Sequence, residues 1–405
     1  MTVQRTLIKN ARVYTPDAVI ERSSVVVNNE GKIEEAGVCE NSSTYDRIID
    51  AEGLLLLPGF IDIHIHGGNG YSVMDGTYEA LSGVSTYHAK HGTTSFLATT
   101  TTGTREAIIK ALNCAADSME KGVPGAEIIG IHLEGPYLNL KRCGAQSKEE
   151  IRPSNLIELK EFLEAGNGQL KLATIAPEIE NGMMALQFLK DNGVTVSIGH
   201  SDATFEQVKE AVKKGASQTT HHFNGMSPVH HREPGVAGAG LIMNEITPEI
   251  ISDGIHVHPA IVKLLFDTKG PSNICAITDA VACAGLPEGE YGDVVMKEGQ
   301  VMLKDGSSLA GSTLTMINAF KNILTFTGYS IEAILPSFTL VPARQIHMGH
   351  QKGSIEAGKD ADFLLVDSEL TILSTFVKGK EVYNCSGTSS SKPIKITLER
   401  VHGND

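Results

Sequence analysis

The sequence lacks any apolar stretch that approaches the length of a membrane-spanning helix, which argues against a protein embedded in a bilayer through helices. It also lacks the basic and then apolar order of a secretory leader at its N-terminus. No Cys-x-x-Cys pair occurs, and the scattered cysteines indicate reduced thiols. These are Cys39, Cys114, Cys143, Cys275, Cys283 and Cys385. We therefore expect a cytoplasmic protein.

Positive charge is in short supply as well. The chain has 34 lysines and arginines against 48 aspartates and glutamates, a net charge of −14. This balance argues against nucleic acid or an anionic membrane as the main partner, although a few local cations can still bind a small anionic substrate. With 405 residues, of which 41% are hydrophobic, the chain is suited to a globular α/β enzyme with one large and one smaller domain.

Both ends of the chain have the pattern of short strands separated by turns. Near the N-terminus these strands are residues 6–14 and 24–27, and near the C-terminus they are 358–367 and 375–383. Because a long segment separates the two β-rich ends, we predict one discontinuous β-sandwich formed from both termini. Its limits are predicted as residues 1–57 and 358–405.

The middle of the chain, residues 58–357, alternates apolar strands with amphipathic helices such as 205–214. The expected strands are residues 54–62, 94–99, 128–133, 170–175, 194–199, 218–220, 249–252 and 273–278. About eight strand–helix units are the number found in a (β/α)₈ barrel. In such barrels the catalytic groups gather at the C-terminal ends of the strands.

Histidines and carboxylates follow several of these strands. His64 and His66 are at positions i and i+2 after the first apolar run, so that they project from the same side. Later strands end at Glu134, His200, His221 and Asp279. Together these donors predict a divalent metal site suited to zinc or iron(II). Asp279 is not required as a permanent ligand, which makes it the natural proton acceptor from a water molecule activated by the metal.

Several motifs resemble those of the N-acetylglucosamine-6-phosphate deacetylases, a group within the amidohydrolase superfamily. The similarity runs nearly end to end, from Pro58 to Asp362. The most specific motifs are residues 132–136, 199–201 and 221–226, supported by 232–235, 253–256 and 309–312. Many amidohydrolases instead use a carbamylated lysine on the fourth strand. A glutamate on the third strand is the mark of this group, so Glu134 argues against a hydantoin or dihydropyrimidine substrate.

The resemblance implies a role for each matching residue. Glu134, His200 and His221 are expected to hold the principal metal, and His64 and His66 to complete a second position. One or two divalent ions per subunit are implied, with zinc preferred over iron(II) or another transition metal. Asp279 is expected to act as general base and then as general acid. The implied substrate contacts are Ala145, Gln146, Asn224, Gly225, Arg232, His256, Leu309, Ala310 and Gly311.

Three of these contact assignments carry further implications. Residues 309–311 resemble a loop that closes over the sugar. Gln146 stands where some members of the group carry a histidine, so it can hydrogen-bond the substrate but cannot carry charge. Arg232 resembles an arginine that reaches the phosphate of the neighbouring subunit, which implies a homodimer.

The implied activity is hydrolysis of the N-acetyl group of N-acetylglucosamine 6-phosphate to glucosamine 6-phosphate and acetate. Two alternatives stay open. The first is the same reaction on N-acetylgalactosamine 6-phosphate, since the two sugars differ only at C4 and residues 230–234 are compatible with either epimer. The second is a non-catalytic scaffold protein with an amidohydrolase fold, although the chain retains every ligand and Asp279.

Overall fold

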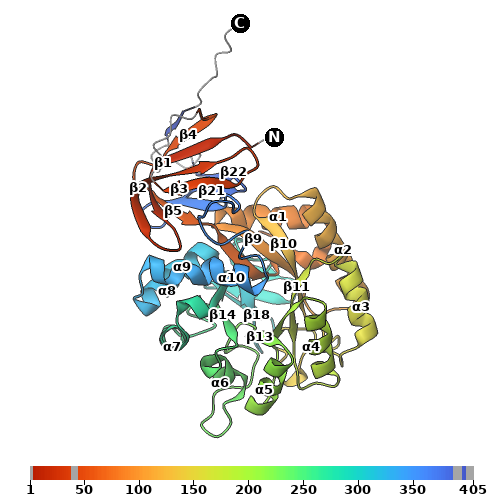
Figure 1. Cartoon of the computed structure of the whole chain (residues 1–405). Coiled ribbons are helices and arrows are strands. Elements are labelled where there is room, and N and C mark those ends of the chain that lie inside the picture. Colours follow the sequence, from red (N-terminus) through yellow and green to blue (C-terminus); the bar gives the residue numbers. More distant parts are fainter. Residues whose placement is uncertain (1–2, 38–43, 386–394, 398–405) are drawn as a thin grey trace.

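The computed structural model of the chain describes residues 3–37, 44–385 and 395–397. Figure 1 shows a barrel surrounded by helices, with a β domain at one side in which the red N-terminal strands lie beside the blue C-terminal ones. The predicted fold class, a (β/α)₈ barrel with a small discontinuous β-sandwich formed from both termini, is confirmed: the sheet topology contains the barrel and a separate β domain.

The β domain is one sheet whose main path runs β22–β21–β20–β5–β1–β2–β3, with β4 pairing with β1 and β23. The strands are β1 (Thr6–Tyr14), β2 (Val19–Val27), β3 (Ile33–Gly37), β4 (Arg47–Asp50), β5 (Leu55–Pro58), β20 (Phe363–Val366), β21 (Ile372–Val377), β22 (Lys380–Asn384) and β23 (Lys395–Thr397). Ile8, Val25 and Phe363 from three of these strands are buried in one cluster. The sheet therefore curls around a core of its own. We propose residues 1–57 and 358–405 as the limits of this domain.

The barrel consists of eight parallel strands in the order of the chain. They are β6 (Phe60–Ile65), β9 (Thr93–Thr99), β10 (Glu127–Glu134), β11 (Leu170–Ile175), β12 (Thr195–Ile198), β13 (Ala216–Thr219), β14 (Thr247–Ile251) and β15 (Cys275–Ile277). The first and last strands meet where Asp279 N–H donates to His64 O at 3.0 Å and Ile65 bridges Ala280. A short hairpin of β7 (Gly67–Gly68) and β8 (Tyr71–Ser72) follows β6.

Helices surround the barrel, and their buried apolar faces share clusters with the strands. They are α1 (Tyr78–Lys90), α2 (Arg105–Lys121), α3 (Leu156–Ala165), α4 (Gly182–Asp191), α5 (Phe205–Lys213), α6 (Gly235–Ile242), α7 (Pro259–Lys269), α8 (Met316–Thr327), α9 (Ile331–Phe338) and α10 (Leu340–Gln345). The helix expected at 205–214 is α5. It begins at a capping box, in which the side chains of Thr204 and Gln207 each accept the other's backbone N–H.

The apolar run at 54–62 was expected to form one barrel strand, and this expectation is wrong. The run divides at Gly59: β5 belongs to the β domain, and β6 opens the barrel and contains His64 within it. Gly59 N–H donates to Asp362 O at 2.9 Å, and a Cβ on Gly59 would lie 2.2 Å from Thr94 Oγ1. The chain therefore passes from one sheet to the other at a position where only glycine fits.

A four-stranded antiparallel sheet, which the sequence pattern did not predict, is inserted between β15 and α8. Its strands are β16 (Gly289–Tyr291), β17 (Val294–Lys297), β18 (Gln300–Leu303) and β19 (Leu309–Ser312). Met296, Val301 and Ala310 form its small core with Cys283. Residues 309–311, expected as a loop, are therefore part of a strand.

A buried lysine joins the two domains. Lys352 Nζ lies 2.7 Å from Glu127 at the start of β10. It also lies 2.9 Å from Asp360 and 2.7 Å from Asp362, which precede β20. The Lys352 side chain is only 1% exposed. Its ammonium group is thus paired with a cluster of three carboxylates.

Among the described residues, no helix is both long enough and apolar enough to cross a membrane. The thiols of Cys114, Cys143, Cys275 and Cys283 are free. Cys39 lies outside the described residues.

Candidate active site

A cavity of about 700 Å³ opens at the C-terminal ends of the barrel strands, where the sequence placed the candidate ligands. Its lining includes His66, Glu134, His200, His221 and Asp279. His64 lies beside them with no exposed surface. The structure therefore brings all six predicted donors to one end of the barrel.

The first group of donors consists of Glu134, His200 and His221, all buried. Glu134 ends β10, while the two histidines follow β12 and β13. The two Nε2 atoms lie 3.1 Å apart. Glu134 Oε1 lies 3.4 Å from His200 Nε2 and 3.3 Å from His221 Nε2. Three donor atoms thus point at one small volume.

Backbone carbonyls determine which ring nitrogen of His200 and of His221 carries the proton. His200 Nδ1 lies 2.8 Å from Arg142 O, and His221 Nδ1 lies 3.1 Å from Asn224 O. A carbonyl oxygen only accepts, so each neutral ring carries its proton on Nδ1. Both Nε2 lone pairs then face each other, and Glu134 Oε1 is buried with no hydrogen-bond donor among the residues that the structure describes. A cation between these three atoms satisfies all of them, which is the donor arrangement of a divalent metal site.

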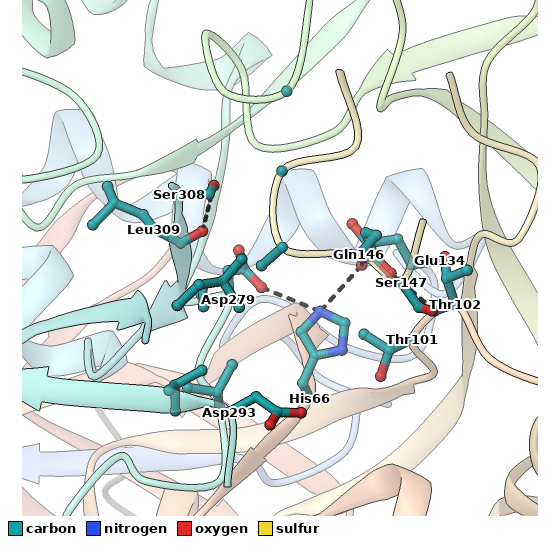
Figure 2. A pocket seen from close by; sticks show the side chains of 18 of the residues that line it. His66, Thr101, Thr102, Glu134, Gln146, Ser147, Asp279, Asp293, Ser308 and Leu309 are labelled. Carbon is teal, nitrogen blue, oxygen red and sulfur yellow. Dashed lines mark hydrogen bonds and ion pairs between the residues drawn. The ribbon is translucent and has the colours of Figure 1, made fainter. Parts of the chain in front are cut away.

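The second group consists of His64, His66 and Asp279. The Nε2 atoms of the two histidines lie 3.2 Å apart. Asp279 Oδ1 lies 3.2 Å from His66 Nε2 and 3.6 Å from His64 Nε2. Figure 2 shows the His66 ring pointing into the cavity toward Asp279 and Glu134. Asp279, expected from the sequence only to move protons, is therefore also within reach of a metal ion at this position.

The two groups adjoin each other, because Glu134 Oε2 lies 3.3 Å from His66 Nε2. Burial disfavours the charged forms of these groups, but their mutual attraction outweighs it. Hydrogen bonds to Asp279 and Glu134 raise the pKa of His66 to about 9. The charge of His64 and the hydrogen bond from His66 lower the pKa of Asp279 to about 2. Both carboxylates are therefore ionised at neutral pH, as ligands of a cation must be.

The predicted substrate contacts fall into two sets. Those that line the cavity are Ala145, Gln146, Asn224, Gly225, His256, Leu309, Ala310 and Gly311. Arg232 does not line it: it lies on the exposed loop before α6, with Nη1 2.7 Å from His231 Nε2. Among the described residues, no arginine or lysine lines the cavity.

Gln146 contacts a candidate metal ligand. Its Nε2 donates to Glu134 Oε2 at 2.6 Å, and its Oε1 accepts the N–H of Thr102 at 2.9 Å. Both ends of the amide are therefore used within the protein. This contact orients Glu134, whereas the sequence analysis expected Gln146 to hydrogen-bond the substrate.

The sequence analysis missed Glu249, which lies on β14 with no exposed surface. Its Oε2 lies 3.0 Å from His64 Nδ1 and accepts the backbone N–H of His221 at 3.1 Å. The available signal was a lone carboxylate at the start of an apolar strand, Glu249–Ile251. A second unpredicted carboxylate, Asp253, lies 2.6 Å from His256 Nδ1.

Comparison with known proteins gives concordant results. The sequence profile of the amidohydrolase family matches residues 55–382. The chain is 40% identical to the N-acetylglucosamine-6-phosphate deacetylase of Bacillus subtilis, over 92% of this chain and 96% of that protein. It is 37% identical to the N-acetylgalactosamine-6-phosphate deacetylase of Escherichia coli O157:H7, over 82% and 88% of the two chains. The crystal structure of the N-acetylglucosamine-6-phosphate deacetylase of Pasteurella multocida superimposes with a TM-score of 0.87 at 31% identity, covering 93% of this chain and 99% of that one.

Proposed function

The chain belongs to the amidohydrolase family and, within it, to the N-acetylglucosamine-6-phosphate deacetylases, and from this membership we propose how its site performs the reaction. The reaction is hydrolysis of N-acetylglucosamine 6-phosphate to glucosamine 6-phosphate and acetate. The observation that carries the proposal is the pair of adjoining donor groups at the mouth of the barrel, with Asp279 beside them. An amide is a poor electrophile and has a poor leaving group. The site must therefore activate the carbonyl carbon for attack and protonate the leaving nitrogen.

We assign the principal metal position to Glu134, His200 and His221, and a second position to His64 and His66 with Asp279. A divalent ion held there supplies Lewis-acid chemistry, which activates a water molecule and polarises the acetyl carbonyl. Imidazole and carboxylate donors suit zinc or another borderline transition metal such as iron(II). Zinc is the ion we propose.

The proton steps belong to Asp279. Its ionised carboxylate takes a proton from the attacking water as the carbon–oxygen bond forms at the acetyl group. The same proton then passes to the sugar nitrogen as the carbon–nitrogen bond breaks, because that nitrogen cannot leave as an anion. General acid–base assistance of this kind contributes about 10²–10⁴-fold. The products are acetate and the free amine.

Binding of the substrate's phosphate holds the acetamide in the position where it reacts, so the free energy of phosphate binding contributes to catalysis. His256 is our candidate for contact with it. Burial lowers the pKa of His256, but the hydrogen bond to Asp253 outweighs this and raises it, which favours the imidazolium form. Asn224 and Gly225 line the cavity beside His221 and are proposed as sugar contacts.

We propose that the second phosphate contact is Arg232 of another copy of the chain. A doubly charged anion is best bound by a guanidinium, and the described lining of the cavity offers no arginine or lysine. Arg232 lies on an exposed loop, where it can reach a partner. Co-expression tests this dimer: R232A and D279N chains are each expected to be weakly active. A mixed dimer regains one working site, since the R232A subunit keeps Asp279 and receives Arg232 from its partner. Failure to regain activity would show that Arg232 does not act across subunits.

The experiment that tests the function is acetate release by metal-loaded protein from three substrates in parallel. These are N-acetylglucosamine 6-phosphate, its galacto epimer and unphosphorylated N-acetylglucosamine. We expect preference for the first and a strong loss without the phosphate. Preference for the epimer would support the alternative that the E. coli relative represents. Absence of acetate release from all three substrates, with metal bound, would refute the substrate assignment and favour the alternative of a non-catalytic scaffold protein.

A further inference from the structure

We propose that Glu249 is a positioning residue that assembles both donor groups and specifically prepares His64 to bind a metal ion. This inference rests on the two metal positions of the proposed function. Glu249 touches neither the cavity nor the candidate ligand atoms themselves. It contacts one ligand residue of each group, at His64 Nδ1 and at the backbone N–H of His221, away from the Nε2 atoms that would bind a metal ion.

The carboxyl group of Glu249 fixes the position of the proton on the His64 ring. Glu249 Oε2 lies 3.0 Å from His64 Nδ1, and an ionised carboxylate can only accept. In the neutral form that binds a metal ion, the proton of the His64 ring is therefore on Nδ1, and Nε2 faces the position beside His66 Nε2, which lies 3.2 Å away. A carboxylate behind an imidazole also increases the basicity of the ligand nitrogen. The ring is held in the one tautomer and orientation that can donate to a metal ion at this position.

Glu249 also supports the backbone at His221, which has a φ of +30°, a value that residues with a side chain rarely adopt. Glu249 holds this segment at two points: its Oε2 accepts the N–H of His221 at 3.1 Å, and its backbone O accepts the N–H of His222 at 2.8 Å. The ring of His221 is oriented separately, by Asn224 O. One carboxylate oxygen thus links a ligand of each group.

Burial of the Glu249 carboxyl group costs free energy. Glu249 has no exposed surface, and its Oε1 has no hydrogen-bond donor among the described residues. Leaving such an atom unsatisfied is unfavourable, and burying a carboxylate is more so. Within the described part of the chain, the ion pair found for Glu249 is with His64 and not with a lysine or arginine. Apolar side chains of similar shape would fill this place on β14 without that cost. We therefore assign this buried carboxyl group a role in the site rather than in folding.

The test uses E249Q, which keeps the shape of the side chain and an oxygen that can accept the N–H of His221. Its neutral amide pairs less strongly with the His64 ring. The matched control is E178Q. Glu178 is also a carboxyl group that contacts the segment of a candidate ligand, since it accepts from Ser201 Oγ and Asp202 N just after His200, but it does not contact a ligand imidazole. Metal-free samples of wild type, E249Q and E178Q are titrated with Zn²⁺ against a chelating indicator. Thermal unfolding confirms that each is folded.

We expect two equivalents of Zn²⁺ in the wild type and in E178Q. In E249Q we expect one equivalent with unchanged affinity and the other weakened by about 10- to 100-fold. Two equivalents of wild-type affinity in folded E249Q, equal weakening of both, or a single equivalent in the wild type would each overturn the proposal. Acetate release by the wild type is measured separately. Absence of acetate with both ions bound would refute the proposed substrate while leaving the role of Glu249 intact.

Discussion

Replacement of Asp279 by asparagine is the sharpest test of the proposed proton transfer. Asp279 has a φ of +52°, a left-handed conformation that asparagine tolerates well. Its backbone is anchored by hydrogen bonds to His64 O at 3.0 Å and from Ser312 N at 2.8 Å, neither of which involves the side chain. The D279N variant should therefore keep the fold and the shape of the site while losing the group that accepts a proton.

The expected size of the effect follows from that role. Loss of a general acid–base residue lowers kcat by about 10²–10⁴-fold. At about 1.4 kcal/mol per factor of ten, this corresponds to roughly 3–6 kcal/mol of lost transition-state stabilisation. The group formed by Glu134, His200 and His221 does not include Asp279, so at least one equivalent of metal should remain bound. KM should change little, because substrate binding is assigned to other residues.

The assay is acetate release at saturating N-acetylglucosamine 6-phosphate, with metal content measured on the same samples. Thermal unfolding of both proteins checks the fold. A kcat within about threefold of wild type at equal metal content would refute the proton-transfer role of Asp279. Loss of all bound metal would show instead that Asp279 acts chiefly as a ligand, contrary to the placement of the principal metal at Glu134.

Three further predictions follow from other features. R232A should raise KM for the phosphorylated sugar by at least about tenfold and leave the metal content unchanged, since a charge-assisted hydrogen bond is worth roughly 1.5–3 kcal/mol. An unaltered KM in steady-state kinetics would contradict the assignment of Arg232 to the phosphate. K352M should lower the free energy of unfolding, measured in urea, by about 3–5 kcal/mol, because it removes the cation shared by the buried Asp360 and Asp362 and the partly buried Glu127. A loss below about 1 kcal/mol would contradict this. The pKa of His66 is raised to about 9, so its ring must lose a proton before it binds a metal ion. The affinity for Zn²⁺ at the position that includes His66 should therefore rise with pH up to about 9, and Zn²⁺ binding should release protons. Zn²⁺ titrations between pH 6 and pH 8 in two buffers of different ionisation enthalpy check this, and a pH-independent affinity would be inconsistent with it.

Much of the fold and of the site could be predicted from the sequence because both leave local signals. The period of the apolar residues changes from the ends of the chain to the middle, which identified the β domain and the barrel. The predicted donors stand where strands end, and parallel strands of a barrel bring those ends together whatever the details of packing. His64, Glu134 and His221 could thus be placed at one site from their positions in the chain.

Other features depend on contacts between distant residues and left no such signal. The apolar run through Gly59 looks like one strand, and only the contact of Gly59 with Thr94 and Asp362 shows that it serves two sheets. The strands β16–β19 are short and partly exposed, so their pattern is weak. The contacts of Gln146 with Glu134 likewise join residues on different segments.

The sequence by itself determined the fold class and the set of candidate metal donors, because residue type and position at a strand end are sufficient for both, and it led to the proposal of Asp279 as proton carrier. Only the tertiary structure decided how those donors are oriented. Glu249 illustrates the difference: it is 185 residues from His64 in the chain, yet its carboxylate lies 3.0 Å from the His64 ring. The closure of the barrel brings β6 and β14 into reach of each other, and hydrogen bonds across that distance select the tautomer of a ligand.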